Sequence, residues 1–183
     1  MHKILRILVV FLLLTFLFPA STPLAQYIPN APFKPQYPKA PDFTLKDIQG
    51  KIFRLSAQKG KPVLIFFGTT WCPGCRSEIP VYKKVYETYV PKGLEVIYIN
   101  IMEPANKVKR FAEAQSLPYR VILDENGTVA NTYNVIGVPT IMLVDKDGNV
   151  IKMGHSSSEM PLDQVVQGKE VPQTGTGGKG KPK

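Results

Sequence analysis

The chain has 183 residues, of which 44% are hydrophobic, and a formal net charge of +9. That length and apolar content suit one domain with its own core, plus appendages. The charge is divided among residues 1–25 (+2), residues 26–168 (+4) and residues 169–183 (+3), and the middle part has no block of like charges. An even distribution of this kind is typical of a solvated surface and excludes a nucleic-acid-binding footprint.

Residues 1–25 are predicted to be an export signal or a membrane anchor. A short basic start is followed by an apolar run over residues 7–18, as in the n-region and h-region of a signal peptide. The run is shorter than the roughly 20 apolar residues of a spanning helix. Cleavage after Ala25 would leave Pro23 where small residues are favoured, so an uncleaved anchor with membrane contact through residues 4–18 stays open. Both alternatives predict an extracytoplasmic domain, in the periplasm or at the outer face of the cytoplasmic membrane.

Residues 26–40 are predicted to be a stiff Pro-rich linker. Prolines recur every third residue from Pro29 to Pro41, which is the turn length of a polyproline II helix. At the other end, residues 169–183 are rich in Gly, Lys and Pro without apolar periodicity, and we expect a disordered basic tail. The folded domain is predicted over residues 41–168.

Strand and helix patterns alternate through residues 41–168. The predicted strands cover residues 43–45, 52–54, 63–67, 94–101, 121–123, 140–144 and 150–153, and the predicted helices cover residues 73–89, 104–115, 128–133 and 161–167. This order predicts an α/β fold in which a mixed central β-sheet, with an N-terminal β-hairpin, is flanked by helices.

The two cysteines, Cys72 and Cys75, stand two residues apart where a buried strand passes into a helix. This spacing and position indicate thioredoxin-like redox chemistry. With Pro73 at the first helical position, Cys72 becomes the N-cap, so its sulfur faces backbone amides and the positive end of the helix dipole. A thiolate is stabilised there. We therefore predict that Cys72 attacks and that Cys75, one turn further and more buried, resolves the mixed disulfide.

The cysteine pair has two other interpretations, a zinc site and a structural disulfide. A structural zinc site generally needs four ligands, and the chain offers besides the cysteines only His2, within the signal, and His155, which is predicted to lie on the surface. No metal and no cofactor are therefore predicted. A purely structural disulfide stays open, although so small a loop would contribute little stability.

Five segments give the chain a resemblance to a known family. They are Ala40-Pro41-Asp42-Phe43-Thr44-Leu45, Gly60-Lys61-Pro62-Val63, Trp71-Cys72-Pro73-Gly74-Cys75, Gly137-Val138-Pro139-Thr140 and Asp145-Lys146-Asp147-Gly148. On these segments the chain resembles the TlpA/ResA-type thioredoxins, exported disulfide reductases that are often tethered to the membrane. The resemblance implies a thioredoxin fold and thiol-disulfide oxidoreductase activity. It also implies disulfide-containing exported proteins as substrates, possible participation in cytochrome c maturation, and a membrane electron donor.

The resemblance implies roles for further residues. Pro139 would follow a cis peptide bond and lie against the dithiol, the backbone of Val138 would pair with an extended substrate segment, and Trp71 would contact the partner. A plain proline at a strand entry and an ordinary packed aromatic are the alternatives.

Glu78 is the predicted proton-handling residue. It follows Cys75 by three residues and so lies on the same helical face, at the position of the family's acidic residue. Thioredoxins proper have a buried aspartate where this chain has Phe66, so proton transfer by a carboxylate falls to Glu78. A solvated surface glutamate is the alternative.

Two other functions stay open. A thiol peroxidase of peroxiredoxin type is suggested by the Thr-x-x-Cys element from Thr69 to Cys72, although Ile65 stands where those enzymes have a proline. A copper carrier would use both thiolates, but no third ligand is placed convincingly near them.

Overall fold

The structure is a computed structural model that describes residues 39–169 and 171. The predicted export segment, nearly all of the linker and most of the tail lie outside these residues. Among the described residues, no helix is long and apolar enough to cross a membrane. The two described linker residues contact the domain, since the amide of Ala40 donates to the carbonyl of Gly148 at 2.9 Å.

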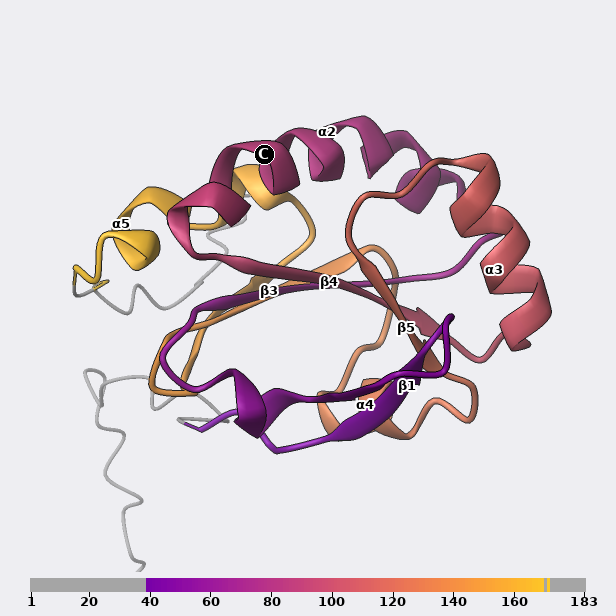
Figure 1. Cartoon of the computed structure of the whole chain (residues 1–183), viewed down its shortest axis with the longest axis horizontal. Coiled ribbons are helices and arrows are strands. Elements are labelled where there is room, and N and C mark those ends of the chain that lie inside the picture. Colours follow the sequence, from indigo (N-terminus) through magenta and orange to yellow (C-terminus); the bar gives the residue numbers. More distant parts are fainter. Residues whose placement is uncertain (1–38, 170, 172–183) are drawn as a thin grey trace, which may run out of the picture. The chain divides into compact units, whose positions relative to one another are not determined.

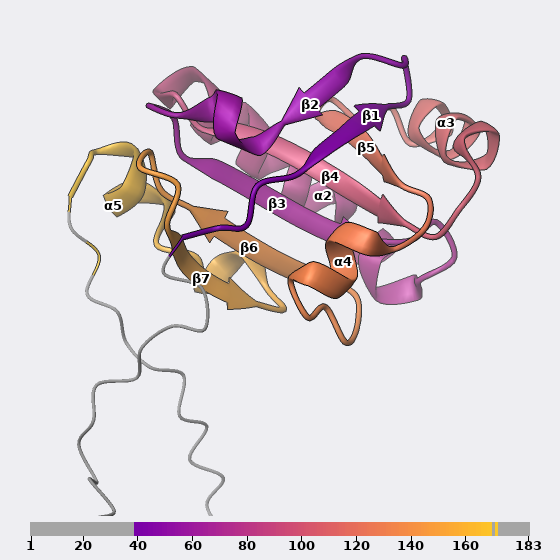
Figure 2. The same cartoon turned by 90° about the horizontal axis from the view of Figure 1, so that it is seen from below.

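Seven strands form one mixed sheet in the order β2-β1-β5-β4-β3-β6-β7 (Figures 1 and 2). The strands are β1 (Thr44–Asp47), β2 (Ile52–Arg54), β3 (Val63–Gly68), β4 (Glu95–Ile101), β5 (Arg120–Asp124), β6 (Thr140–Val144) and β7 (Val150–Gly154). The central strands β3, β4 and β5 are parallel, whereas β1, β2, β6 and β7 join by antiparallel pairing. The predicted thioredoxin-like sheet and its N-terminal hairpin are confirmed.

Helices cover both faces of the sheet, as predicted. Three of them, α2 (Pro73–Tyr89), α3 (Ala105–Ala114) and α5 (Leu162–Val166), lie on one face, and α4 (Thr128–Thr132) lies on the other beside the β1–β2 hairpin (Figures 1 and 2). Three short 3₁₀ helices, η1 (Leu55–Gln58), η2 (Val90–Lys92) and η3 (Ser157–Glu159), were not predicted. They occupy connections whose sequences have no helical periodicity.

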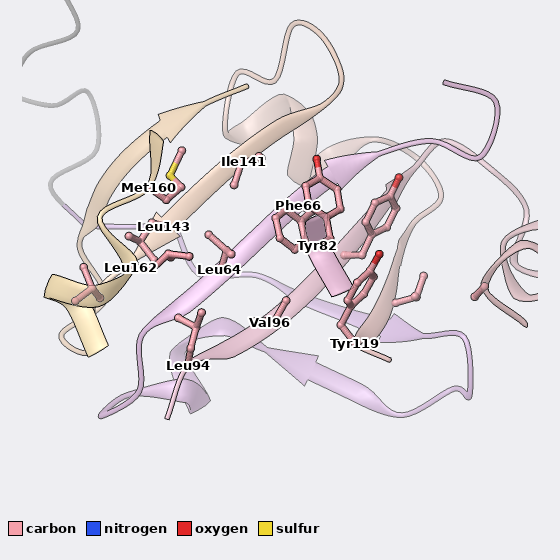
Figure 3. Packing of buried hydrophobic residues seen from close by; sticks show 14 of the residues in the cluster. Leu64, Phe66, Tyr82, Leu94, Val96, Tyr119, Ile141, Leu143, Met160 and Leu162 are labelled. Atoms are coloured by element: carbon pink, nitrogen blue, oxygen red, sulfur yellow. The ribbon is translucent and has the colours of Figure 1, made fainter. Parts of the chain in front are cut away.

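Strand β3 divides the core into two clusters. All its residues are buried, and successive side chains point to opposite faces of the sheet. Leu64 and Phe66 join the cluster under α2, α3 and α5, here called the tyrosine-side core because it includes Tyr82, Tyr98 and Tyr119. Figure 3 shows Tyr82 over Phe66, with ring centroids 3.7 Å apart. The alternate residues, among them Ile65 and Phe67, join the cluster that packs on the hairpin and α4, here called the hairpin-side core.

The sheet brings three chain segments to one edge. Gly68 at the end of β3 pairs with Asn100 near the end of β4, and Phe67 pairs with Thr140 at the start of β6. Parallel strands end at the same edge, and the connections beyond them form sites there. The segments that follow β3 and β4 therefore lie beside the one that precedes β6.

Candidate active site

Cys72 is the N-cap of α2, as predicted. Its sulfur accepts a hydrogen bond from the amide of Cys75 at 3.1 Å, and Pro73 is the first residue of the helix. The thiol donates to the carbonyl of Val138, with 3.6 Å between sulfur and oxygen. Both cysteines are free thiols. An amide aimed at the sulfur from a helix N-terminus stabilises negative charge there.

Cys75 lies deeper, with 2% of its surface exposed against 5% for Cys72. Burial raises the pKa of the Cys75 thiol to about 12, assisted by its hydrogen bond and charge interaction with Cys72. Hydrogen bonds from the backbone of Thr69 and the hydroxyl of Tyr98 act in the opposite direction. Cys75 therefore carries its proton at neutral pH and must lose it before it can act as a nucleophile.

The segment before β6 closes one side of the dithiol. The Val138–Pro139 peptide bond is cis, as the resemblance implied. A Cβ atom built on Gly74 would lie 3.4 Å from Cδ of Pro139 and 4.0 Å from the sulfur of Cys72. Pro139 thus lies against the first turn of α2, and the backbone of Val138 borders the sulfur.

Large apolar side chains are exposed at the same edge of the sheet. Trp71 before α2, Met102 after β4 and Ile136 before the cis peptide bond are 65%, 69% and 92% exposed. All three lie in connections and not in strands or helices. Met102 and Ile136 escaped sequence analysis because a single apolar residue in a connection carries no periodic signal.

Two charged residues of α2, Glu78 and Arg76, lie beside aromatic side chains. Glu78 is half-buried, and its charge acts on Tyr82, whose pKa burial raises. The guanidinium of Arg76 is 5.9 Å from the ring centre of Phe111 on α3.

Glu103 is a buried carboxylate beneath the loop that leads to Cys72. It accepts hydrogen bonds from the amide and the hydroxyl of Thr70, each at 2.6 Å, and from the side chain of Asn100 at 2.9 Å. Lys107 completes the set with an ion pair at 2.6 Å. Burial favours the protonated acid, but these partners outweigh it, and the pKa of Glu103 is lowered. The carboxylate thus fixes Thr70, two residues before the attacking cysteine.

Glu103 was missed in the sequence because Thr70, from which it accepts two hydrogen bonds, lies 33 positions away in the chain. His155 was expected on the surface, and it is exposed. Its ring nitrogen Nδ1 also lies 2.8 Å from the carbonyl oxygen of Pro139, so it supports the cis-proline segment from behind. Among the described residues, no group of three or more His, Cys, Asp or Glu side chains could hold a metal ion.

The fold and the site together define a class. A thioredoxin fold whose first cysteine caps a helix, with a second cysteine buried one turn on and a cis-proline beside them, is that of the thioredoxin-like dithiol proteins. The chain belongs to the AhpC/TSA family, whose sequence profile matches residues 38–153.

Individual relatives confirm the resemblance to TlpA/ResA-type thioredoxins that the sequence predicted. The chain is 40% identical over 111 residues to "Thiol-disulfide oxidoreductase ResA" of Geobacillus kaustophilus, an alignment that covers 61% of this chain and 64% of the relative, less than two thirds of its length. The protein of that name from Bacillus anthracis is 37% identical over 123 residues, 66% of this chain and 71% of that one. A crystal structure from Chlorobium tepidum, described as a thiol:disulfide interchange protein of the thioredoxin family, is 31% identical with a TM-score of 0.61 and covers 73% of this chain and 97% of that one.

Proposed function

We propose that the protein is an extracytoplasmic thiol-disulfide oxidoreductase that reduces disulfides of exported proteins through Cys72 and Cys75. The observation that carries the proposal is the free dithiol, in which Cys72 caps α2 and accepts the amide of Cys75. The ResA relatives support the same activity.

The reaction proceeds in two exchanges. The Cys72 thiolate attacks one sulfur of the substrate disulfide, forms a mixed disulfide and expels the other substrate sulfur as a thiolate. Cys75 then loses its proton and attacks the sulfur of Cys72, which closes the Cys72–Cys75 disulfide and releases the second substrate thiolate. Two electrons pass to the substrate, whose two thiolates take up the two protons lost by the dithiol.

Substrate contact is assigned to the rim of the dithiol. An extended segment of the substrate pairs with the backbone of Val138 beside Pro139, and Trp71 packs on its apolar side chains. The Cys72 thiolate has no proton to donate to the Val138 carbonyl. A backbone amide of the substrate therefore takes the place of the thiol as hydrogen-bond donor. Glu78 serves as the acceptor that carries the proton of Cys75 toward solvent.

The cellular setting follows from the predicted export segment. Residues 1–25 deliver the domain outside the cytoplasm, residues 26–40 space it from the membrane if the segment is uncleaved, and residues 41–168 carry the activity. A membrane electron donor then returns the disulfide to the dithiol, and cytochrome c maturation supplies one class of substrate.

Trapping tests the order of attack. Cys75→Ser should accumulate mixed disulfides with exported proteins on non-reducing gels, because the second exchange cannot occur. Cys72→Ser is the matched control and should trap none. Trapping by Cys72→Ser instead would reverse the assignment.

The direction of electron flow is tested by the reduction potential. No cation lies between the cysteines, and Arg76 is placed over Phe111, so the thiolate gains its stability from the helix end alone. We therefore expect a fairly reducing potential when the protein is equilibrated with glutathione buffers. A value near the roughly −120 mV of the strongest periplasmic oxidants would make the protein a disulfide donor.

A thiol peroxidase is the second candidate, favoured by the AhpC/TSA match and by Thr69 three residues before Cys72. Hydrogen peroxide consumption by the reduced protein separates the two functions. Turnover of peroxide that exceeds turnover of a protein disulfide would favour the peroxidase.

A further inference from the structure

The space beside Cys75 is shaped by a glycine and filled by a tyrosine. A Cβ atom built on Gly68 would lie 2.1 Å from the hydroxyl oxygen of Tyr98 and 3.2 Å from the sulfur of Cys75. Any other residue at this position would therefore collide with the phenol. The absence of a side chain at Gly68 allows the Tyr98 hydroxyl to reach the resolving cysteine from β4, across the end of β3.

The surroundings make Tyr98 a hydrogen-bond donor. Only 3% of its surface is exposed, and the titratable groups that act most on it are Cys75, Tyr119, Tyr82 and Cys72. Burial raises the pKa of Tyr98, so the hydroxyl keeps its proton throughout the range in which thiols ionise. Its hydrogen bond with Cys75 favours the ionised sulfur.

The other two tyrosines of the tyrosine-side core are placed differently. The hydroxyls of Tyr82 and Tyr119 find no hydrogen-bond partner among the described residues. The rings of Tyr98 and Tyr119 are stacked, with centroids 6.2 Å apart. Tyr119 therefore supplies a comparison within the same cluster: a buried phenol of the same chemistry without the contact to sulfur.

We propose that Tyr98 is a catalytic residue of the second exchange, in which its hydroxyl donates a hydrogen bond to the Cys75 sulfur and stabilises the thiolate that resolves the mixed disulfide. The proposal rests on the assignment of Cys72 as attacking and Cys75 as resolving cysteine. Phe66 stands where thioredoxins proper have a buried aspartate, and Tyr98, its register partner on β4, brings a neutral donor to Cys75 instead. The proton of Cys75 leaves toward solvent, since Tyr98 keeps its own.

The test separates the two exchanges by rapid mixing. The fully reduced protein is mixed with one equivalent of dithiobis(nitrobenzoate), whose disulfide releases one coloured thiolate when Cys72 attacks and a second when Cys75 resolves the adduct. Tyr98→Phe removes the hydroxyl and keeps the ring, and Tyr119→Phe is the matched control. Both variants are compared with the unchanged protein over a range of pH.

We expect the first phase to be unchanged in both variants and the second to slow about tenfold in Tyr98→Phe alone, as for the loss of a hydrogen bond to a charged group. The pH profile of the second phase should move to higher pH in that variant, which a loss of packing would not produce. An unchanged second phase in Tyr98→Phe, or equal slowing by Tyr119→Phe, would overturn the role of Tyr98.

A failure of the proposed function would look different. If Cys72 were not the attacking group, Cys72→Ser would retain the first phase, whatever Tyr98 does. A second measurement concerns Cys75 alone: in a Cys72→Ser background, the pH dependence of Cys75 alkylation should move upward when Tyr98→Phe is added. No movement there would also contradict the proposal.

Discussion

The two faces of the central sheet bury aromatic residues in different ways. In the hairpin-side core, the buried side chains are hydrocarbon apart from Met142 and Tyr133, and the hydroxyl of Tyr133 donates to the carbonyl of Pro41. The tyrosine-side core under α2 buries three phenols, of which Tyr82 and Tyr119 have no hydrogen-bond partner among the described residues.

The difference suggests that the hairpin-side core is packed for stability, whereas the tyrosine-side core is packed around a reactive group, Cys75. A buried polar atom without a partner costs about 1–3 kcal/mol, and a core selected for stability alone would replace it with phenylalanine. The cost is found on the face that carries Cys75, where one of the three phenols contacts the sulfur. Departures of this kind from ideal packing are expected where function is located.

The largest expected effect tests the stability face. Phe67→Ala removes a side chain of the hairpin-side core that is 1% exposed, and we expect the free energy of unfolding to fall by about 3–5 kcal/mol. Denaturant titration measures the loss. The two phases of disulfide exchange should stay unchanged in the folded protein, because the side chain lies across the sheet from Cys75. Slowed exchange with unchanged stability would reverse the division of roles.

Glu103→Gln tests a buried polar group that, unlike the hydroxyls of Tyr82 and Tyr119, is fully hydrogen-bonded within the described part of the chain. Replacing the carboxylate weakens its bonds to Thr70, Asn100 and Lys107, so we expect a loss of about 2–3 kcal/mol at neutral pH. The pKa of Glu103 is lowered in the fold. The contribution of Glu103 to stability is therefore present above its pKa in the unfolded chain, about 4.3, and is lost as pH falls through its lower pKa in the folded protein.

The difference in stability between the original protein and Glu103→Gln should accordingly shrink below about pH 4. Unfolding measured at several acidic pH values checks this. A difference that stays constant down to acid pH would mean that the charge of Glu103 contributes nothing. The exposed pair between Lys146 and Asp147 supplies a control, since neutralising Asp147 should change little.

The reduced protein should also lose stability in alkali through Cys75. Burial raises the pKa of this thiol to about 12, whereas a thiol in the unfolded chain ionises at about 8.5. The stabilisation is complete below the pKa of the unfolded chain and is lost as pH rises toward the pKa of the folded protein. By pH 10 the loss amounts to about 2 kcal/mol. Cys75→Ser should lack this decline between pH 8 and pH 10. An equal decline in the variant would assign the effect to other groups.

Most of the fold could be predicted from the sequence, because its signals are local. Apolar runs such as residues 63–67 and 140–144 placed the strands within one or two residues of the observed ends. The dithiol was equally accessible, since the N-capping position of Cys72 follows from Pro73 alone. The cis bond before Pro139 came from the family resemblance.

The rest of the site depends on contacts between distant segments. Glu103 meets Thr70 across 33 positions of the chain, and Tyr98 meets Cys75 only because Gly68 has no side chain. In the sequence, Tyr98 is one apolar residue of a buried strand, and nothing local marks its hydroxyl. A signal does exist once the topology is known: Gly68 ends a strand that is otherwise fully apolar.

The smallest expected effects compare the two faces through the hydroxyl of one tyrosine on each, Tyr119 and Tyr133. Tyr119→Phe removes a hydroxyl that has no partner among the described residues, so its removal should leave the free energy of unfolding unchanged or raise it by about 1 kcal/mol. Tyr133→Phe removes the donor to the Pro41 carbonyl and should lower the free energy of unfolding by about 1 kcal/mol. Both changes delete the same atom from a buried ring, so the opposite signs cannot come from lost hydrophobic area. Denaturant midpoints measured side by side, with equal slopes, decide the outcome. A loss of stability in Tyr119→Phe as large as that in Tyr133→Phe would mean that its hydroxyl is hydrogen-bonded in solution, and the contrast between the two faces would then rest on Tyr82 and Tyr98 alone.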